Sequence, residues 1–233
     1  MNLAEERTVW LMMRRPISIL IIAVASLAMA GCARTAPDPR TSEGAVASES
    51  DGENDVADLI DTGQPLAAGR YTRSGFEPRV ELALDGSWQA VQLFDGFFDV
   101  QQDVGSPDVI AVQFAKPGRI DGAEGSVEPA DAADAVELVS ANPNLTVIES
   151  SDSRIGGLSG HQVTVANEGT AHARILLVPP GPLGIDPGRR LWMAFFDTDA
   201  GLLAIMVGGS TERWEEALTA AEPVLESVAI GGE

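Results

Sequence analysis

The fold is decided most clearly by residues 191–207, which read LWMAFFDTDAGLLAIMV. Two apolar runs, 191–196 and 202–207, flank the segment DTDAG. Apolar runs of this length are typical of β-strands, and a short polar segment that ends in glycine is typical of a tight turn. The stretch therefore predicts an antiparallel β-hairpin.

Further strands are predicted upstream of this hairpin. Residues 80–84 alternate apolar and polar or small side chains, and Asp85-Gly86 directly after them is a strong signal for a hairpin turn. Residues 160–178 are interpreted as another hairpin, with its turn near Glu168-Gly169. The loop at 179–184 contains three prolines and two glycines, which predicts irregular structure. The other predicted strands cover residues 88–93, 97–100, 109–114 and 145–149.

Two segments have the spacing of helices. In residues 129–141 the apolar side chains gather on one face, with proline in the first turn and Asn142-Pro143 as the stop. A final helix is expected after a cap at Ser210 or Thr211, with Pro223 kinking or ending it; its apolar face is formed by Trp214, Leu218, Ala221 and Leu225. The predicted fold class is α+β, a single domain of mostly antiparallel sheet with two packed helices.

The N-terminus has the pattern of an export signal. Arg14 and Arg15 precede an uncharged aliphatic run, 17–30, which is shorter than the ~20 residues of a membrane-spanning helix. Residues 1–31 are therefore predicted to be a signal peptide, whose true start is Met12 or Met13.

The end of this signal, Leu27-Ala28-Met29-Ala30-Gly31-Cys32, resembles the lipobox of bacterial lipoproteins. The resemblance implies that Cys32 is diacylated, with chains such as palmitate, and becomes the first residue of the mature protein. Two acyl chains anchor a protein stably, whereas one holds only marginally. The expected location is the cell membrane, with the chain lipid-anchored on the extracytoplasmic face.

The predicted organisation after the signal is a tether followed by a domain. Residues 32–66 are rich in small and acidic residues and lack aromatics, which predicts a disordered acidic linker. Within it, Val56, Leu59 and Ile60 are expected to form at most a brief helical turn. Residues 67–233 are predicted to form the globular domain, which is long enough to bury a core.

Composition excludes several classes of protein. The chain has 35 Asp+Glu against 15 Lys+Arg, a net charge of −20, so a nucleic-acid partner is not expected. A single cysteine excludes a disulfide within one chain. A hydrophobic content of 45% with 14 prolines argues against a multi-pass membrane protein and a coiled coil.

The sequence contains no convincing catalytic or metal-binding pattern. On the hairpin predicted for 160–178, His161 and His172 lie roughly 16 Å apart at ~3.3 Å per residue, so they share no metal. The segment Gly157-Leu158-Ser159-Gly160-His161 fails the G-x-S-x-G pattern of a nucleophile elbow. Residues 197–201 imitate only the start of a calcium loop. We therefore expect a non-enzymatic protein without a metal or cofactor.

Aromatic residues offer the one weak indication of a ligand site. Phe97-Phe98 and Phe195-Phe196 are consecutive pairs within predicted strands, so one ring of each pair faces away from the other. If helices cover only one face of the sheet, rings on the other face form an apolar pocket or patch. If both faces are covered, all the rings belong to the core. The candidate ligand-binding residues are Trp88, Phe97, Trp192 and Phe195.

Residues 69–230 resemble a bacterial secreted domain of the Mog1/PsbP-like type. The matched segments are Gly69-Arg70-Tyr71-Thr72, Asp85-Gly86-Ser87-Trp88, Ser140 to Val147, Gly156 to Gly160, and Glu222 to Val228. The resemblance implies an α/β sandwich and carries no catalytic residues. The expected function is a membrane-anchored binding or interaction module whose partner is an unknown envelope protein or small ligand. The alternatives are a cell-envelope hydrolase and a structural or assembly lipoprotein.

Overall fold

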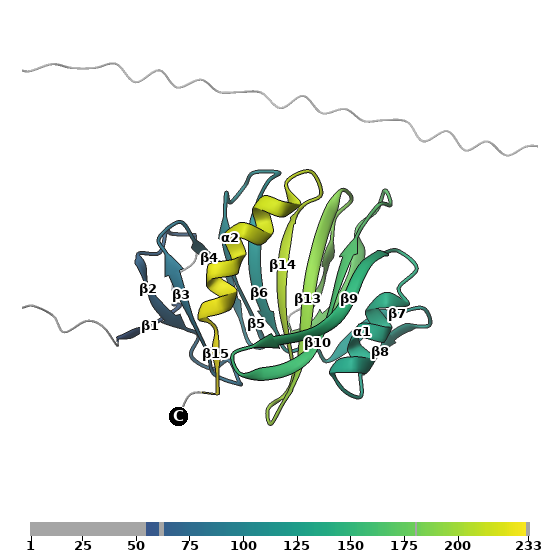
Figure 1. The fold of residues 1–233 in the computed structure, drawn as a ribbon, viewed down its shortest axis with the longest axis horizontal. Coiled ribbons are helices and arrows are strands. Elements are labelled where there is room, and N and C mark those ends of the chain that lie inside the picture. The colour runs from purple at the N-terminus through teal and green to yellow at the C-terminus, as the bar shows by residue number, and fades with distance from the viewer. Residues whose placement is uncertain (1–54, 61–62, 180, 232–233) are drawn as a thin grey trace, which may run out of the picture. The chain divides into compact units, whose positions relative to one another are not determined.

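The computed structural model describes residues 55–60, 63–179 and 181–231. The predicted signal peptide and Cys32 lie outside these residues. A seven-stranded sheet forms the centre of the folded unit, and each of its neighbouring strands is antiparallel (Figure 1). Its strands, in spatial order, are β4 (Gln89–Phe94), β5 (Phe97–Gln102), β6 (Ile110–Ala115), β14 (Gly201–Ser210), β13 (Arg189–Thr198), β10 (Leu158–Ala166) and β9 (Thr146–Ile155).

Each face of the central sheet is covered by a small sheet and a helix. One face packs against α2 (Trp214–Ser227) and a sheet of β1 (Val56–Asp58), β2 (Ala68–Thr72), β3 (Val80–Asp85) and β15 (Ala229–Ile230). The other face packs against α1 (Ala132–Ser140) and a sheet of β12 (Gly181–Ile185), β11 (Ala173–Val178), β7 (Arg119–Gly122) and β8 (Gly125–Val127).

The consecutive aromatic pairs show how the central sheet divides the interior. Phe98 and Phe196 lie in the core beneath α2, whereas Phe97 and Phe195 lie in the core beneath α1. All four rings are at most 1% exposed. Because side chains alternate between the faces of a strand, a strand that is buried on both faces reads as a continuous apolar run.

The structure confirms the α+β prediction and the hairpin at 191–207. In that hairpin β13 pairs with β14 from Arg189 opposite Ser210 to Thr198 opposite Gly201. Helix α1 lies where it was expected, although it begins after an N-cap at Asp131, so Pro129 precedes the first turn. Pro223 lies inside α2, which continues to Ser227.

Three predicted details of the strands are wrong: two concern which strands pair, and one concerns a segment predicted as a loop. The Asp85-Gly86 turn joins β3 to β4, but these strands belong to different sheets. The strands predicted as one hairpin over 160–178 are also separated, because β10 pairs with β9 and β13 while β11 pairs with β7 and β12. Residues 181–185 form the strand β12, where an irregular loop was predicted.

The folded unit begins earlier in the chain than residue 67. Strand β1 pairs in parallel with β2, and Leu59, directly after it, is 1% exposed in the core beneath α2. The helical turn that was predicted here is therefore wrong. Residues 32–54 of the predicted tether lie outside the described residues.

The two edges of the central sheet differ. Backbone groups of the preceding segment cover β4, since the Gly63 amide donates to the Ala90 carbonyl at 2.7 Å and the Leu66 amide to the Trp88 carbonyl at 2.8 Å. At the opposite edge, β9 pairs with β10 alone among the described strands, and seven successive residues from its start are exposed. The pairing of β9 with β10 shifts register next to Val165.

One carboxylate is fully buried in the central sheet. Asp99 on β5 is 0% exposed; its Oδ1 accepts from the Gln92 amide at 2.7 Å and its Oδ2 from Gln101 Nε2 at 2.6 Å. Burial raises the pKa of Asp99 because the charged form loses its hydration, and the hydrogen bonds offset this only in part.

This buried carboxylate should leave a signature in the pH dependence of stability. Because the folded-state pKa of Asp99 lies above its unfolded value, its stabilising contribution is fully present below the unfolded pKa and is lost as the pH rises through the folded pKa. The substitution Asp99→Asn leaves an amide there, which does not titrate. We expect the unfolding free energy of Asp99→Asn, minus that of the wild type, to increase from about pH 4 to pH 7 in urea titrations.

Asp85 supplies a control of opposite sign for this experiment. Hydrogen bonds from the hydroxyl and amide of Ser87 lower the pKa of Asp85, so its stabilising contribution is lost as the pH falls. Measured from about pH 2 to pH 5, where a carboxyl with a lowered pKa titrates, the same difference for Asp85→Asn should therefore decrease as the pH rises. Parallel pH profiles for the two variants would contradict the assignment of Asp99.

Candidate functional site

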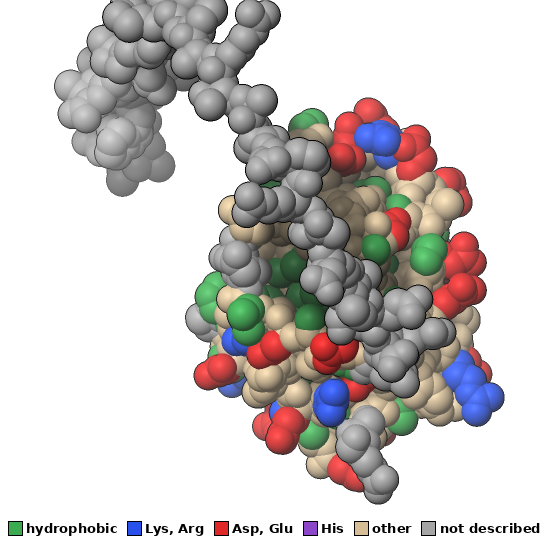
Figure 2. Space-filling model, turned by 90° about the vertical axis from the view of Figure 1, so that its left-hand side faces the viewer, with side chains coloured by type: hydrophobic (Ala, Val, Ile, Leu, Met, Phe, Trp, Pro, Cys, Tyr) green, Lys and Arg blue, Asp and Glu red, His purple; other side chains and the backbone are tan. Residues whose placement is uncertain are grey.

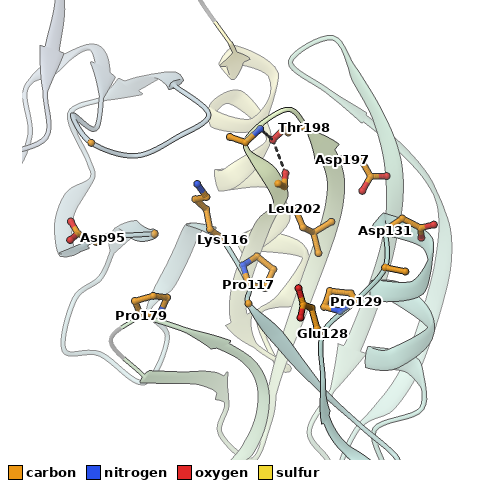
Figure 3. Close-up of a pocket in the computed structure, with 16 residues that line it drawn as sticks. Asp95, Lys116, Pro117, Glu128, Pro129, Asp131, Pro179, Asp197, Thr198 and Leu202 are labelled. Atoms are coloured by element: carbon orange, nitrogen blue, oxygen red, sulfur yellow. Dashed lines mark hydrogen bonds between the residues drawn. The ribbon is translucent and has the colours of Figure 1, made fainter.

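A cleft of about 810 Å³ lies at the end of the folded unit where β13 turns into β14 (Figure 3). Its walls come from six separate places in the chain: the β2–β3 loop, the β4–β5 turn, the residues after β6, the segment before α1, the end of β11, and the β13–β14 turn. Its volume falls within the range of roughly 300–1,000 Å³ that is usual for small-molecule sites.

Local sequence explains how the walls are held. Gly96 in the β4–β5 turn has a φ of 76°, which favours glycine, and its carbonyl accepts from the Lys116 amide at 2.8 Å. Strand β6 ends at Ala115, two residues before Pro117, which has no amide hydrogen to donate. Proline side chains from three walls, together with Leu202, give the cleft its apolar surface; they are Pro117, Pro129 and Pro179.

Two of the acidic groups in the cleft are engaged at the start of α1. The Asp131 side chain accepts from the Asp134 amide at 2.9 Å, and Asp197 Oδ1 accepts from the Ala132 amide at 3.1 Å. Carboxylates at these positions satisfy amides that lack partners within the helix and interact favourably with its dipole. Asp131 and Asp197 therefore have a structural role in this wall.

Three other charged groups in the cleft have no such engagement. Lys116, the only lysine in the sequence, is half-buried, and Asp95 and Glu128 stand on opposite sides of it in Figure 3. Among the described residues, no ion pair or side-chain hydrogen bond involves any of these three groups. Their charges are therefore available to a ligand.

The aromatic residues that were candidates for ligand binding lie elsewhere. Trp88 and Phe97 are 1% exposed and Phe195 is 0% exposed, so these rings belong to the core and offer a ligand no surface. Trp192 is half-buried and packs against the core beneath α2. None of the four lines the cleft. The expectation of a pocket on an open sheet face is corrected by the structure, because both faces are covered.

The two histidines lie apart in the fold, His161 on β10 and His172 directly before β11, and each pairs with an aspartate. His161 Nδ1 is 3.2 Å from Asp152 Oδ1, beside a separate depression of about 480 Å³. His172 Nδ1 is 2.9 Å from Asp186 Oδ1. The histidine side chains are 45% and 48% exposed. Within the described ranges no serine hydroxyl bonds either ring, so neither pair has a nucleophile in place.

Potential metal ligands are scattered among the residues that the structure describes. In residues 55–60, 63–179 and 181–231, no three His, Cys, Asp or Glu side chains gather in a way that would hold a metal ion. The segment 197–201 that imitates a calcium loop is a turn instead, in which Thr198 Oγ1 donates to the Gly201 carbonyl at 2.6 Å. Residues 55–60, 63–179 and 181–231 include no helix that is both long and apolar enough to span a bilayer.

Acidic side chains dominate the molecular surface. Asp and Glu lie around much of the face shown in Figure 2, where Lys and Arg are sparser. Several described arginines are already paired: Arg70 and Arg79 both pair with Glu81, and Arg213 pairs with Asp108 and Glu216. The ammonium group of Lys116 is thus surrounded by a strongly negative molecular surface.

No family model matches the chain, and no curated protein matches it. Among solved structures, the fold is similar to cyanobacterial PsbP (CyanoP) from Synechocystis, with 12% identity, a TM-score of 0.41, and coverage of 73% of this chain and 97% of that one. It is also similar to LpqN of Mycobacterium tuberculosis, a protein involved in cell envelope biogenesis, with 9% identity, a TM-score of 0.37, and coverage of 75% and 88%. At these values the similarity concerns only the shape of the fold. The candidate site is therefore inferred from the residues of this chain alone.

Proposed function

We propose that this chain is a lipid-anchored extracytoplasmic protein whose domain binds a ligand in the cleft and performs no reaction on it. The observation that carries the binding role is the cleft itself, where three unengaged charges lie beside an apolar surface of prolines and Leu202. Few, precisely placed polar groups in an apolar concavity are the usual composition of a ligand site.

The anchoring part of the proposal rests on the sequence. Cys32 is the only cysteine and follows the signal at the position that lipidation requires. The folded unit starts at β1, so residues 33–54 separate the anchor from the domain. A disordered linker of that length, as the sequence predicts, has an r.m.s. reach of roughly 25 Å, which would let the cleft face partners near the membrane.

Mass spectrometry of the intact protein tests the anchor. Protein recovered from the native membrane fraction should have the mass of a chain that begins at Cys32 and carries acyl chains, whereas Cys32→Ser should leave the membrane fraction. An unmodified wild-type chain that is released to the medium would refute the anchor.

Site-specific photocrosslinking in the same membranes tests the binding role. A photoreactive residue in place of Ala200, which lines the cleft, should give a defined adduct. The same residue in place of Ala123, an exposed position outside the cleft, is the matched control and should give none. Equal labelling at both positions, or none at Ala200, would refute the role of the cleft.

A hydrolase is the second candidate function, favoured by the contact of His161 with Asp152. An aspartate that orients histidine Nδ1 is one part of a catalytic triad. Turnover of an envelope substrate by the purified chain, abolished in His161→Ala and retained in His172→Ala, would replace the binding proposal with this one.

A further inference from the structure

We propose that the ligand of the cleft is a small zwitterion that carries both an ammonium and a carboxylate, such as a short peptide with free ends. This inference rests on the proposed role of the cleft as a binding site. It assigns the ligand's carboxylate to Lys116 and its ammonium to Glu128 and Asp95.

The first step of the argument is that the three groups do not neutralise one another. Lys116 is half-buried, and no carboxylate of the described residues lies within ion-pair distance of its ammonium. Elsewhere on this acidic surface, Arg70, Arg174 and Arg213 each form an ion pair with a carboxylate. A partly desolvated ammonium without a partner favours an anionic group from a ligand.

The second step is that one sign of charge alone fits the cleft poorly. Asp95 and Glu128 flank Lys116 in Figure 3 and would repel a ligand that is purely anionic. A purely cationic ligand would meet the carboxylates that line the cleft but would leave the Lys116 ammonium without a partner. Like charges brought together in a partly buried site are unfavourable. A ligand with one group of each sign satisfies both kinds of residue.

The third step concerns size and shape. The cleft is bounded by turns, prolines and glycines, so its walls carry few long side chains beyond Lys116 and Glu128. The apolar surface of Pro117, Pro129 and Leu202 lies between the charged positions. A molecule about as large as a tripeptide can therefore span the charges and cover the apolar wall.

Triglycine and its end-blocked forms test the inference directly. The full-length mature chain, labelled with ¹⁵N in detergent micelles, is titrated with triglycine, N-acetyl-triglycine and triglycine amide. Triglycine should shift the amides of Gly96, Gly118 and Gly201, which line the cleft. Each blocked form should bind about fivefold more weakly, the factor expected for one partly exposed ion pair.

Variants then assign each end of the ligand. Lys116→Gln should weaken triglycine about fivefold and bind triglycine no better than triglycine amide, whereas Lys116→Arg should retain binding. Glu128→Gln should weaken triglycine but strengthen N-acetyl-triglycine. Glu124→Gln, an exposed acidic position outside the cleft, is the matched control and should change neither.

Three results would overturn the inference: equal affinity for triglycine and its blocked forms, unchanged binding by Lys116→Gln, or no shifts in the cleft at any concentration. If crosslinking at Ala200 succeeds while triglycine fails, the cleft binds a ligand of another class. If triglycine binds while the intact mass lacks acyl chains, the ligand class holds and the anchor is refuted.

Discussion

Replacing Phe98 with alanine should lower the free energy of unfolding by about 3–5 kcal/mol, because the deletion removes a ring from a filled core. Phe98 is 0% exposed. Its ring stacks on Phe114 with centroids 4.6 Å apart and meets Phe76 edge-on at 4.9 Å. Phe98 thus joins the central sheet to the loop between β2 and β3, and urea unfolding of the full chain measures its contribution.

Phe94 is the matched control for this experiment. It lies on the neighbouring strand β4 and is 43% exposed, so the same truncation removes much less buried area. We expect Phe94→Ala to cost less than about 1 kcal/mol. Equal losses in the two variants would mean that the core beneath α2 is not packed as described.

Gly160→Ala is the second substitution for which we expect a large effect, about 3 kcal/mol of destabilisation. A Cβ atom at this position would lie 2.0 Å from the carbonyl oxygen of Phe195 and 2.7 Å from the ring of Phe196. The obstacle is the backbone of β13, the strand paired with β10, so relief requires the two strands to separate.

Gly181 provides the comparison for Gly160, since it also lies in a strand and a Cβ there meets nothing within 4 Å. Gly181→Ala should change stability by less than about 0.5 kcal/mol. Thermal unfolding of the two variants distinguishes a steric requirement at Gly160 from a general preference for glycine. Similar melting temperatures would show that the β10–β13 pairing tolerates a methyl group.

The sequence predicted the individual strands and helices better than it predicted which strands pair with each other. Asp85-Gly86 and Asp95-Gly96 carry the same turn signal, yet only the second joins paired strands. Turn chemistry is local and acts alike at both places. The difference is set by burial: β3 alternates buried and more exposed positions, as in a covering sheet, whereas β5 is buried on both faces at residues 97–100. Which strand lies where depends on contacts that are remote in sequence.

The same limit applies to the candidate site. Phe97 and Phe195 were selected because consecutive aromatics face both sides of a strand, and that geometry is confirmed. The covering layer beneath α1 includes β12, from a segment whose prolines indicated an irregular loop, so the closure of this face was not visible in the sequence. Lys116 was visible as the only lysine. The surroundings of Lys116 were not visible, because six separated segments build the cleft.

The open edge at β9 has a consequence if the proposed lipid anchor holds many copies on one membrane. Anchored molecules share a thin layer, where neighbours meet far more often than in free solution, and an unpaired strand invites sheets to join into fibres. Strand β9 carries Glu149, Asp152 and Arg154 at exposed positions and a register shift beside Val147. Charges and irregular pairing of this kind oppose lateral growth of the sheet.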